Sequence, residues 1–262
     1  MKNYIFLVAL IPSIVFAHEP YVAPLAFFTK NTQIPVISGY AEVPFASEYA
    51  LKDVVFHITQ PDQSQTTVTP NTQLKSATVF DLALKLDGTY YISSKVSYPL
   101  QYALYNKEWK IFYDTTEGKE KSIAERDYVI PGDFKKTPQL KNVTREWSIE
   151  TYLSKNKLTE VKEKIDFPLQ VKFSSHPNNI KAGHPVSLAV SKNNKLLTKA
   201  EIVIKEKGQS EQNTKTVLTD LKGRANLTFP AAGQYLLEIT ETQNPKAEPV
   251  NQYYKIISLS VN

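Results

Sequence analysis

The segment RANLTFPAAGQY, Arg224–Tyr235, contains the pattern that decides the fold. Apolar and polar residues alternate up to Phe229, as in a half-buried strand. A turn follows, and Gly233-Gln234-Tyr235 opens the next strand. Ala77–Val96 repeats this order, with Gly88-Thr89-Tyr90 after its turn. In β-sandwiches a tyrosine at such a corner often hydrogen-bonds to the backbone a few residues upstream. Two copies about 145 residues apart therefore predict two related sandwiches.

Short alternating runs of Val, Ile, Thr, Tyr and Phe extend this pattern along the chain, and Pro, Gly, Asn and Asp separate them. In the first half we expect strands over residues 54–59, 77–84, 89–97 and 109–113. In the second half strands resume at Phe167, with runs over 186–190, 200–205, 215–219, 224–229, 234–240 and 253–261. The fold class predicted from this pattern is all-β, with two immunoglobulin-like β-sandwich domains.

Between the two halves the spacing of apolar residues changes from the alternation of a strand to the spacing of a helix. Thr144 can cap a helix in which Ile149, Tyr152 and Leu153 fall at i, i+3 and i+4, and Asn156-Lys157 would end it. The sequence thus predicts a linker with one short helix. The expected division is a signal peptide at 1–17, an N-terminal sandwich at 18–118, the linker at 119–165 and a C-terminal immunoglobulin-like sandwich at 166–262.

Residues 1–17 have the features of a secretory signal peptide. Lys2 precedes an apolar stretch, and Val15 and Ala17 are the small residues before a cleavage site. The stretch is too short to span a membrane, which needs about 20 apolar residues. We expect export to a bacterial periplasm and a mature chain, from His18 onward, that does not span the membrane.

Composition narrows the choice of function. The chain contains no cysteine, so disulfides and thiolate metal sites are excluded. Its formal net charge of +5 is spread over lysines interleaved with glutamates, and arginine occurs only at positions 126, 145 and 224. This pattern lacks the dense basic patch of a nucleic-acid-binding protein, so we expect no nucleic-acid partner. No Gly-x-Ser-x-Gly, His-Glu-x-x-His or phosphate-loop motif occurs, and we expect a protein that is not an enzyme.

Cleavage after Ala17 would leave His18 at the N-terminus of the mature chain. Its α-amine, with a pKa of about 8, and its imidazole Nδ1 together form a chelate. Such nitrogen ligands suit divalent nickel, cobalt, copper or zinc. Glu19 can add an oxygen ligand or orient the ring. The remaining ligands would come from His57, His176 or His184, or from a carboxylate such as Glu42; the predicted metal set is His18, Glu19 and His57.

An alternative function is protein or glycan recognition without a metal. Aromatic residues crowd one region, where an exposed group of them would form a binding patch. They are Tyr90, Tyr91, Tyr98, Tyr102, Tyr105, Trp109 and Tyr113. If alternate members are buried, they stabilise the sheet instead.

Three sequence regions also carry a family resemblance. Pro177 to Tyr235, with Thr219-Asp220-Leu221-Lys222-Gly223 before a strand, resembles a carboxypeptidase-regulatory or transthyretin-like sandwich. Together with Ala17-His18-Glu19 and the segment 147–158, it makes the chain resemble the periplasmic family called domain of unknown function 4198. That resemblance implies nickel or cobalt uptake and an inner- or outer-membrane metal transporter as partner. The chain departs from the family pattern at Pro20, and at Tyr40, where a histidine is expected.

Overall fold

The computed structural model describes residues 18–70, 74–116, 122, 123, 126, 128–163, 165–210, 214–242, 244 and 247–262. The predicted signal peptide, residues 1–17, lies outside the described residues. Within the described ranges no helix has both the length and the apolar character needed to cross a membrane.

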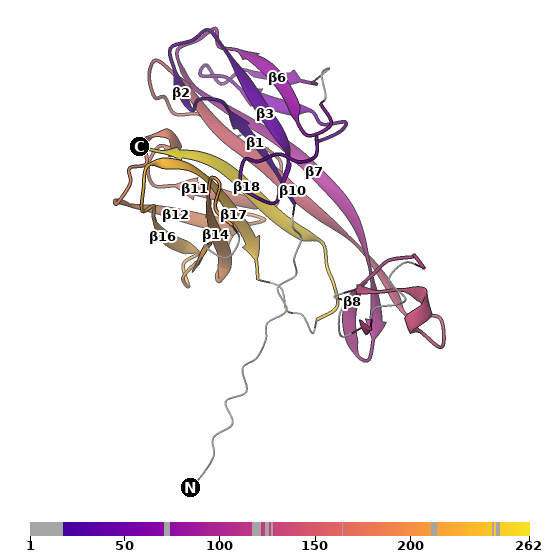
Figure 1. The fold of residues 1–262 in the computed structure, drawn as a ribbon. Helices are drawn as coiled ribbons and strands as arrows, with labels where there is room; N and C mark the ends of the chain where they lie inside the picture. Colours follow the sequence, from indigo (N-terminus) through magenta and orange to yellow (C-terminus); the bar gives the residue numbers. More distant parts are fainter. Residues whose placement is uncertain are drawn as a thin grey trace.

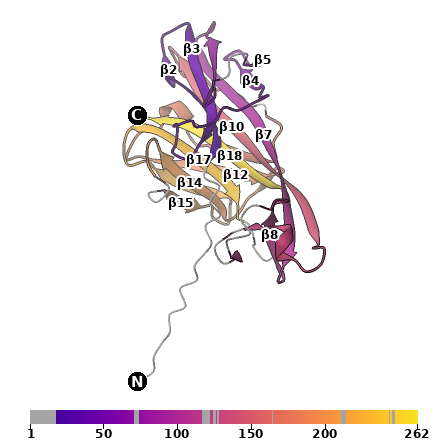
Figure 2. The same ribbon diagram turned by 45° about the vertical axis from the view of Figure 1, so that its right-hand side comes forward.

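The described residues form three β-sheets, and Figures 1 and 2 show how their strands are arranged. Sheet A consists of β1 (Glu19–Pro24), β3 (Gln33–Ala41) and β6 (Thr78–Ala83). The central sheet has the order β15 (Lys215–Leu218), β14 (Ala200–Glu206), β17 (Gly233–Glu241), β18 (Gln252–Val261), β10 (Leu140–Lys155), β7 (Gly88–Tyr105), β4 (Phe56–Thr59) and β5 (Gln65–Val68). Three short strands lie off this path: β2 (Phe28–Thr29), β8 (Glu108–Phe112) and β9 (Tyr128–Val129). Sheet C consists of β11 (Leu169–Phe173), β12 (Pro185–Lys192), β13 (Lys195–Leu196) and β16 (Arg224–Thr228). This arrangement confirms the predicted all-β sandwich architecture.

The central sheet separates two hydrophobic cores, because successive side chains of a strand point to opposite faces. On β7, Tyr90 and Ile92 pack into the first core, with sheet A, while Tyr91 packs into the second, with sheet C. On β18, Ile256 packs into the first core and Ile257 into the second. One sheet is therefore buried on both faces and serves both sandwiches.

β7 and β10 form the longest pairing of the molecule, antiparallel from Gly88–Lys155 to Ala103–Leu140. β10 also pairs in parallel with β18 on its other side, from Arg145–Gln252 to Thr151–Ser258. The far end of this pair, with β8, extends away from both sandwiches (Figure 1). A third, small core of Leu100, Tyr102, Ile111 and Val143 stabilises that end.

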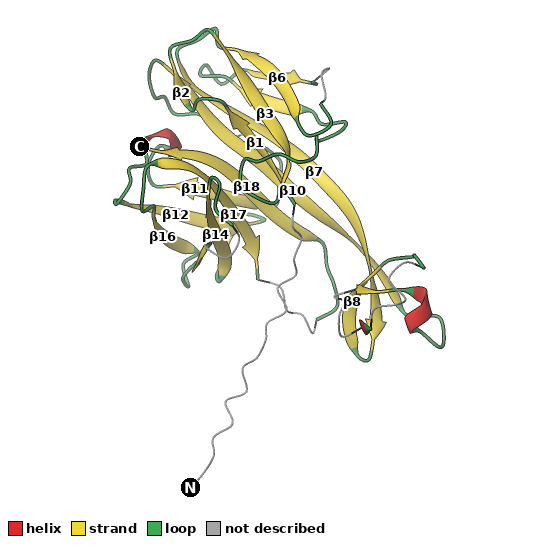
Figure 3. Cartoon of the chain, viewed as in Figure 1, coloured by secondary structure: helices red, strands yellow, loops and turns green. Residues whose placement is uncertain are grey.

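The predicted helix at 144–156 is wrong, because this segment lies in strand β10 (Figure 3). Ile149 and Leu153 pack into the first core and Tyr152 into the second. A strand buried on both faces has apolar residues at nearly every position, so spacings of three and four arise without helical periodicity. The helical elements with described bounds are the 3-10 turns η2 (Pro131–Asp133) and η3 (Pro177–Asn179).

The predicted linker at 119–165 thus contains β9, η2 and β10, and β10 belongs to the central sheet. Whether residues 18–118 and 166–262 are separate folding units stays a prediction.

Both tyrosine corners are present. Tyr90 Oη donates to the Leu86 carbonyl at 2.9 Å and accepts from the Leu86 amide at 2.8 Å. Tyr235 Oη donates to the Ala231 carbonyl at 2.9 Å. Gly88 has a φ of +139°, which a residue with a side chain rarely adopts. The repeated Gly-x-Tyr pattern therefore marks two structurally equivalent corners, as the sequence predicts.

Candidate metal centre

The pairing of β1 with β3 decides where His18 lies. The antiparallel register joins Glu19 to Ala41, so His18 comes just before β1 at the level of Glu42, which follows β3. The chain then turns, with the Ala46 amide donating to the Val43 carbonyl at 2.9 Å, and runs back along β3. That return places Glu48 near the beginning of β1, because its amide donates to the Tyr40 carbonyl at 2.8 Å.

His18, Glu42 and Glu48 form a compact group. Each offers one possible ligand atom, and these atoms lie within 4.8 Å of one another. His18 Nε2 lies 3.0 Å from Glu48 Oε2, and the Glu42 amide donates to Glu48 Oε1 at 3.2 Å. The hydrogen bonds from the His18 ring and the Glu42 amide lower the pKa of the Glu48 carboxyl. The edge of the imidazole meets the Tyr49 ring, with centroids 5.2 Å apart.

This group has the composition of a metal site. The two carboxylates carry negative charge that a divalent cation would neutralise, and the nitrogen and oxygen atoms of the group suit borderline metals. The side chains of His18 and Glu48 keep 32% and 42% of their surface exposed, so an ion has access from solvent. Among the described residues no second group of three such side chains meets the same distance limit.

Glu19 is placed elsewhere. Its carboxylate accepts from Lys205 Nζ of β14 at 2.5 Å, and Lys205 also donates to Glu238 of β17 at 2.8 Å. Burial raises the pKa of Glu19 well above its usual value, and the nearby Glu238 charge adds to this effect, against the influence of Lys205. Glu19 therefore anchors the beginning of β1 rather than joining the His18 group.

The other histidines also lie apart from that group. His57 is exposed on β4, where it pairs with Thr67 and Ser93. His184 is exposed and its Nδ1 lies 3.0 Å from the Ala182 carbonyl. Neither belongs to the group around His18.

His176 has both ring nitrogens in use. Nδ1 accepts from the Asn178 amide at 3.1 Å, so Nε2 carries the proton and faces the Thr159 carbonyl at 3.1 Å and Thr89 Oγ1 at 2.9 Å. Burial lowers its pKa, which favours this neutral form. His176 therefore joins β7 and η3 instead of offering a free ligand atom.

Of the ligands considered from sequence, the structure brings together His18 and Glu42. Glu48 was missed, because it lies six residues beyond Glu42 in an irregular loop and only the return of the chain brings it back. The family resemblance leads one to expect a histidine at position 40. The residue there is Tyr40, which forms an isolated antiparallel β-bridge with Tyr49 beside the group.

The crowded aromatic residues divide between core and surface. Tyr90, Tyr91 and Tyr102 are buried, whereas Tyr98 and Tyr113 keep 49% and 38% of their surface exposed. Tyr105 and Trp109 are half-buried, so only the three buried rings clearly belong to the cores.

Comparison with protein families gives one match over most of the chain. The family model described as "Domain of unknown function (DUF4198)" matches residues 15–243. The chain belongs to this family. In this DUF4198 protein the match begins just before His18 and extends past β17, so it includes the His18 group and both cores except for what β18 contributes to them. No curated protein matches the chain.

Solved structures similar to this DUF4198 protein include the FN1–FN3 domains of chicken CNTN1, with 8% identity, 94% of this chain and 66% of that chain covered, and a TM-score of 0.24. The D0–D1 domain of intimin has 12% identity and a TM-score of 0.22, and the match covers 91% of this chain and 96% of the intimin chain. Escherichia coli α2-macroglobulin, over domains MG0-NIE-MG1, has 12% identity and a TM-score of 0.22, and the match covers 93% of this chain and 64% of that chain.

Proposed function

We propose that this DUF4198 protein is a periplasmic, non-catalytic protein that binds a divalent transition metal at its mature N-terminus and passes it to a membrane metal transporter. The observation that carries the proposal is the group of His18, Glu42 and Glu48 at the seam of the expected signal peptide. Cleavage after Ala17 would add a free α-amine to this group, at the residue that already contributes the imidazole.

The contacts of His18 support a specific division of roles. The α-amine and Nδ1 of His18 would chelate the ion, while Nε2–H donates to Glu48, since metal-bound histidines commonly donate their second nitrogen to a carboxylate. Glu42 would supply an oxygen ligand. The bound ion is nickel, cobalt, copper or zinc, and partial exposure of the group allows its transfer to a partner.

Calorimetric titration of the mature protein, beginning at His18, with Ni²⁺, Co²⁺, Cu²⁺ and Zn²⁺ tests this function. We expect one ion per chain. Adding an alanine before His18 should weaken binding at least about 10-fold, because the α-amine is displaced, and Glu42→Gln should weaken it by a similar factor. His184→Asn is the matched control, since His184 is exposed and lies outside the group.

The proposal fails if none of the four ions binds. Binding that the added alanine leaves unchanged, but that Glu42→Gln and Glu48→Gln abolish, would contradict the role of the α-amine and place the ion between the side chains alone.

A further inference from the structure

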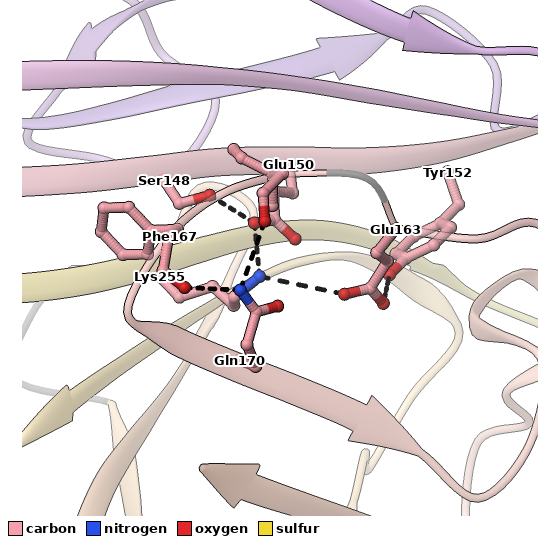
Figure 4. A network of polar contacts seen from close by, with 8 residues as sticks. Ser148, Glu150, Tyr152, Glu163, Phe167, Gln170 and Lys255 are labelled. Atoms are coloured by element: carbon pink, nitrogen blue, oxygen red, sulfur yellow. Dashed lines mark hydrogen bonds and ion pairs between the residues drawn. The ribbon is translucent and has the colours of Figure 1, made fainter. Parts of the chain in front are cut away.

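A second cluster of charged groups lies inside the molecule, between the central sheet and β11. Lys255 of β18 points into it beside Ser148 and Glu150 of β10, and Glu163 reaches it from the segment after β10 (Figure 4). Lys255 faces Glu150 because β18 and β10 are neighbours, with Lys255 directly opposite Ser148 in the parallel register. The two reactive side chains thus come from adjacent strands that are 105 residues apart in sequence.

The Lys255–Glu150 pair at the centre of this cluster is sealed from solvent. The side chains of Lys255 and Glu150 are both 0% exposed, and Lys255 Nζ contacts Glu150 Oε1 directly. Glu163 Oε2 lies 4.0 Å from the same Nζ, and its side chain is 23% exposed. Two carboxylates thus share one ammonium group in a water-poor site, where ionised groups are costly to keep.

We propose that Lys255 and Glu150 condense to form an intramolecular amide bond that covalently joins β18 to β10. A proton passes from the Lys255 ammonium to the Glu150 carboxylate, which Nζ contacts directly. The Nζ lone pair attacks Cδ of Glu150 and forms the C–N bond. One carboxyl oxygen leaves with two protons as water. The ammonium and carboxylate charges disappear together, and no oxidant or other reactant is consumed.

The two carboxylate oxygens of Glu150 have different surroundings and therefore different roles in the reaction. Ser148 Oγ donates to Oε1, which would stabilise the negative charge that develops there when nitrogen attacks. Oε2 is buried and has no hydrogen-bond partner among the described residues. Oε2 is therefore the oxygen that leaves, and its loss removes a buried polar atom without a partner.

Glu163 can move the protons. Burial raises its pKa to about 7, and the Glu150 charge adds to this, against the effects of Lys255 and of the Tyr152 hydroxyl, which donates to Glu163. A carboxyl that titrates near neutral pH and lies 4.0 Å from Nζ can accept a proton from the attacking nitrogen and release it again as water leaves. Glu163 itself is unchanged at the end of the reaction.

The cluster of Lys205, Glu19 and Glu238 provides a comparison within the same chain. It also places one lysine against two carboxylates, but its side chains keep 12% to 19% of their surface exposed. Water can reach that cluster, so Lys205 should remain a free amine. An amide at Lys255 would supply the cross-link that a chain without cysteine cannot obtain from a disulfide.

Intact-mass spectrometry of the purified mature protein tests the amide directly. We expect a mass lower than the sequence mass by one water, and a proteolytic peptide in which Lys255 is joined to Glu150. Lys255→Arg and Glu150→Ala should each restore the full mass, and Lys205→Arg should leave the one-water deficit in place. Glu163→Gln should slow formation at least about 100-fold, so that uncondensed protein is recovered.

Wild-type protein with the full sequence mass and a free Lys255 peptide would overturn the proposal, whether or not the variants fold. A one-water deficit that fragmentation places at other residues would overturn it equally.

Discussion

At the scale of single residues, Glu163 makes stability depend on pH. Burial raises its pKa from 4.5 to about 7 in the folded protein, and the Glu150 charge adds to this before Glu150 and Lys255 condense. The native state therefore holds a proton between these two values that the unfolded chain has released, so stability falls as pH rises through this window. The loss is at most about 3 kcal/mol and is complete above pH 7.

Urea unfolding of wild type and Glu163→Gln at pH 4.5 and pH 8 measures this dependence. We expect the wild-type protein to lose more stability than the variant between the two values, because glutamine does not titrate. Equal losses in both proteins would show that Glu163 is not the group responsible.

At the scale of elements, Lys205 secures the N-terminal strand. It joins Glu19 at the start of β1 to β14 and to Glu238 of β17. Lys205→Met would leave two half-buried carboxylates without their cation, so the cost should lie between those of an exposed and a fully buried pair, at about 1–3 kcal/mol. We expect a loss of this size in urea unfolding at pH 7.

Lys141→Met is the control for Lys205. Lys141 pairs with Glu248, but the two side chains are 41% and 59% exposed, so its removal should cost less than about 1 kcal/mol. Similar losses in the two variants would mean that burial does not distinguish the two pairs.

At the scale of the whole molecule, the central sheet makes the two sandwiches interdependent. The first core takes Trp147, Ile149 and Leu153 from β10, and Ile256 from β18. A fragment of residues 18–118 lacks both strands, so we expect it to remain unfolded, with little dispersion in its amide NMR spectrum. The full mature chain should unfold in one cooperative transition. A well-dispersed spectrum for the fragment would support the division expected from sequence and contradict this interdependence.

The sequence predicted local structure well over much of the chain, although β1 and β3 were not among the expected strands. Alternation located most of the strands, and the two Gly-x-Tyr patterns located both tyrosine corners, because these features depend on neighbouring residues. It failed for Ile149, Tyr152 and Leu153, whose spacing suits a helix as well as a strand buried on both faces. In that case, pairing with β7 and β18 overrides local preference.

The candidate metal site was likewise predicted only in part from the sequence. His18 could be chosen from the cleavage pattern, and Glu42 from its carboxylate chemistry, because both properties belong to single residues. The sequence by itself determined the all-β class, the likeness of the two corners and the chemistry of His18. Tertiary structure alone decided that Glu48 joins His18, that Glu19 turns to Lys205, and that Lys255 meets Glu150, because strand register and chain reversal bring together residues that no local pattern relates.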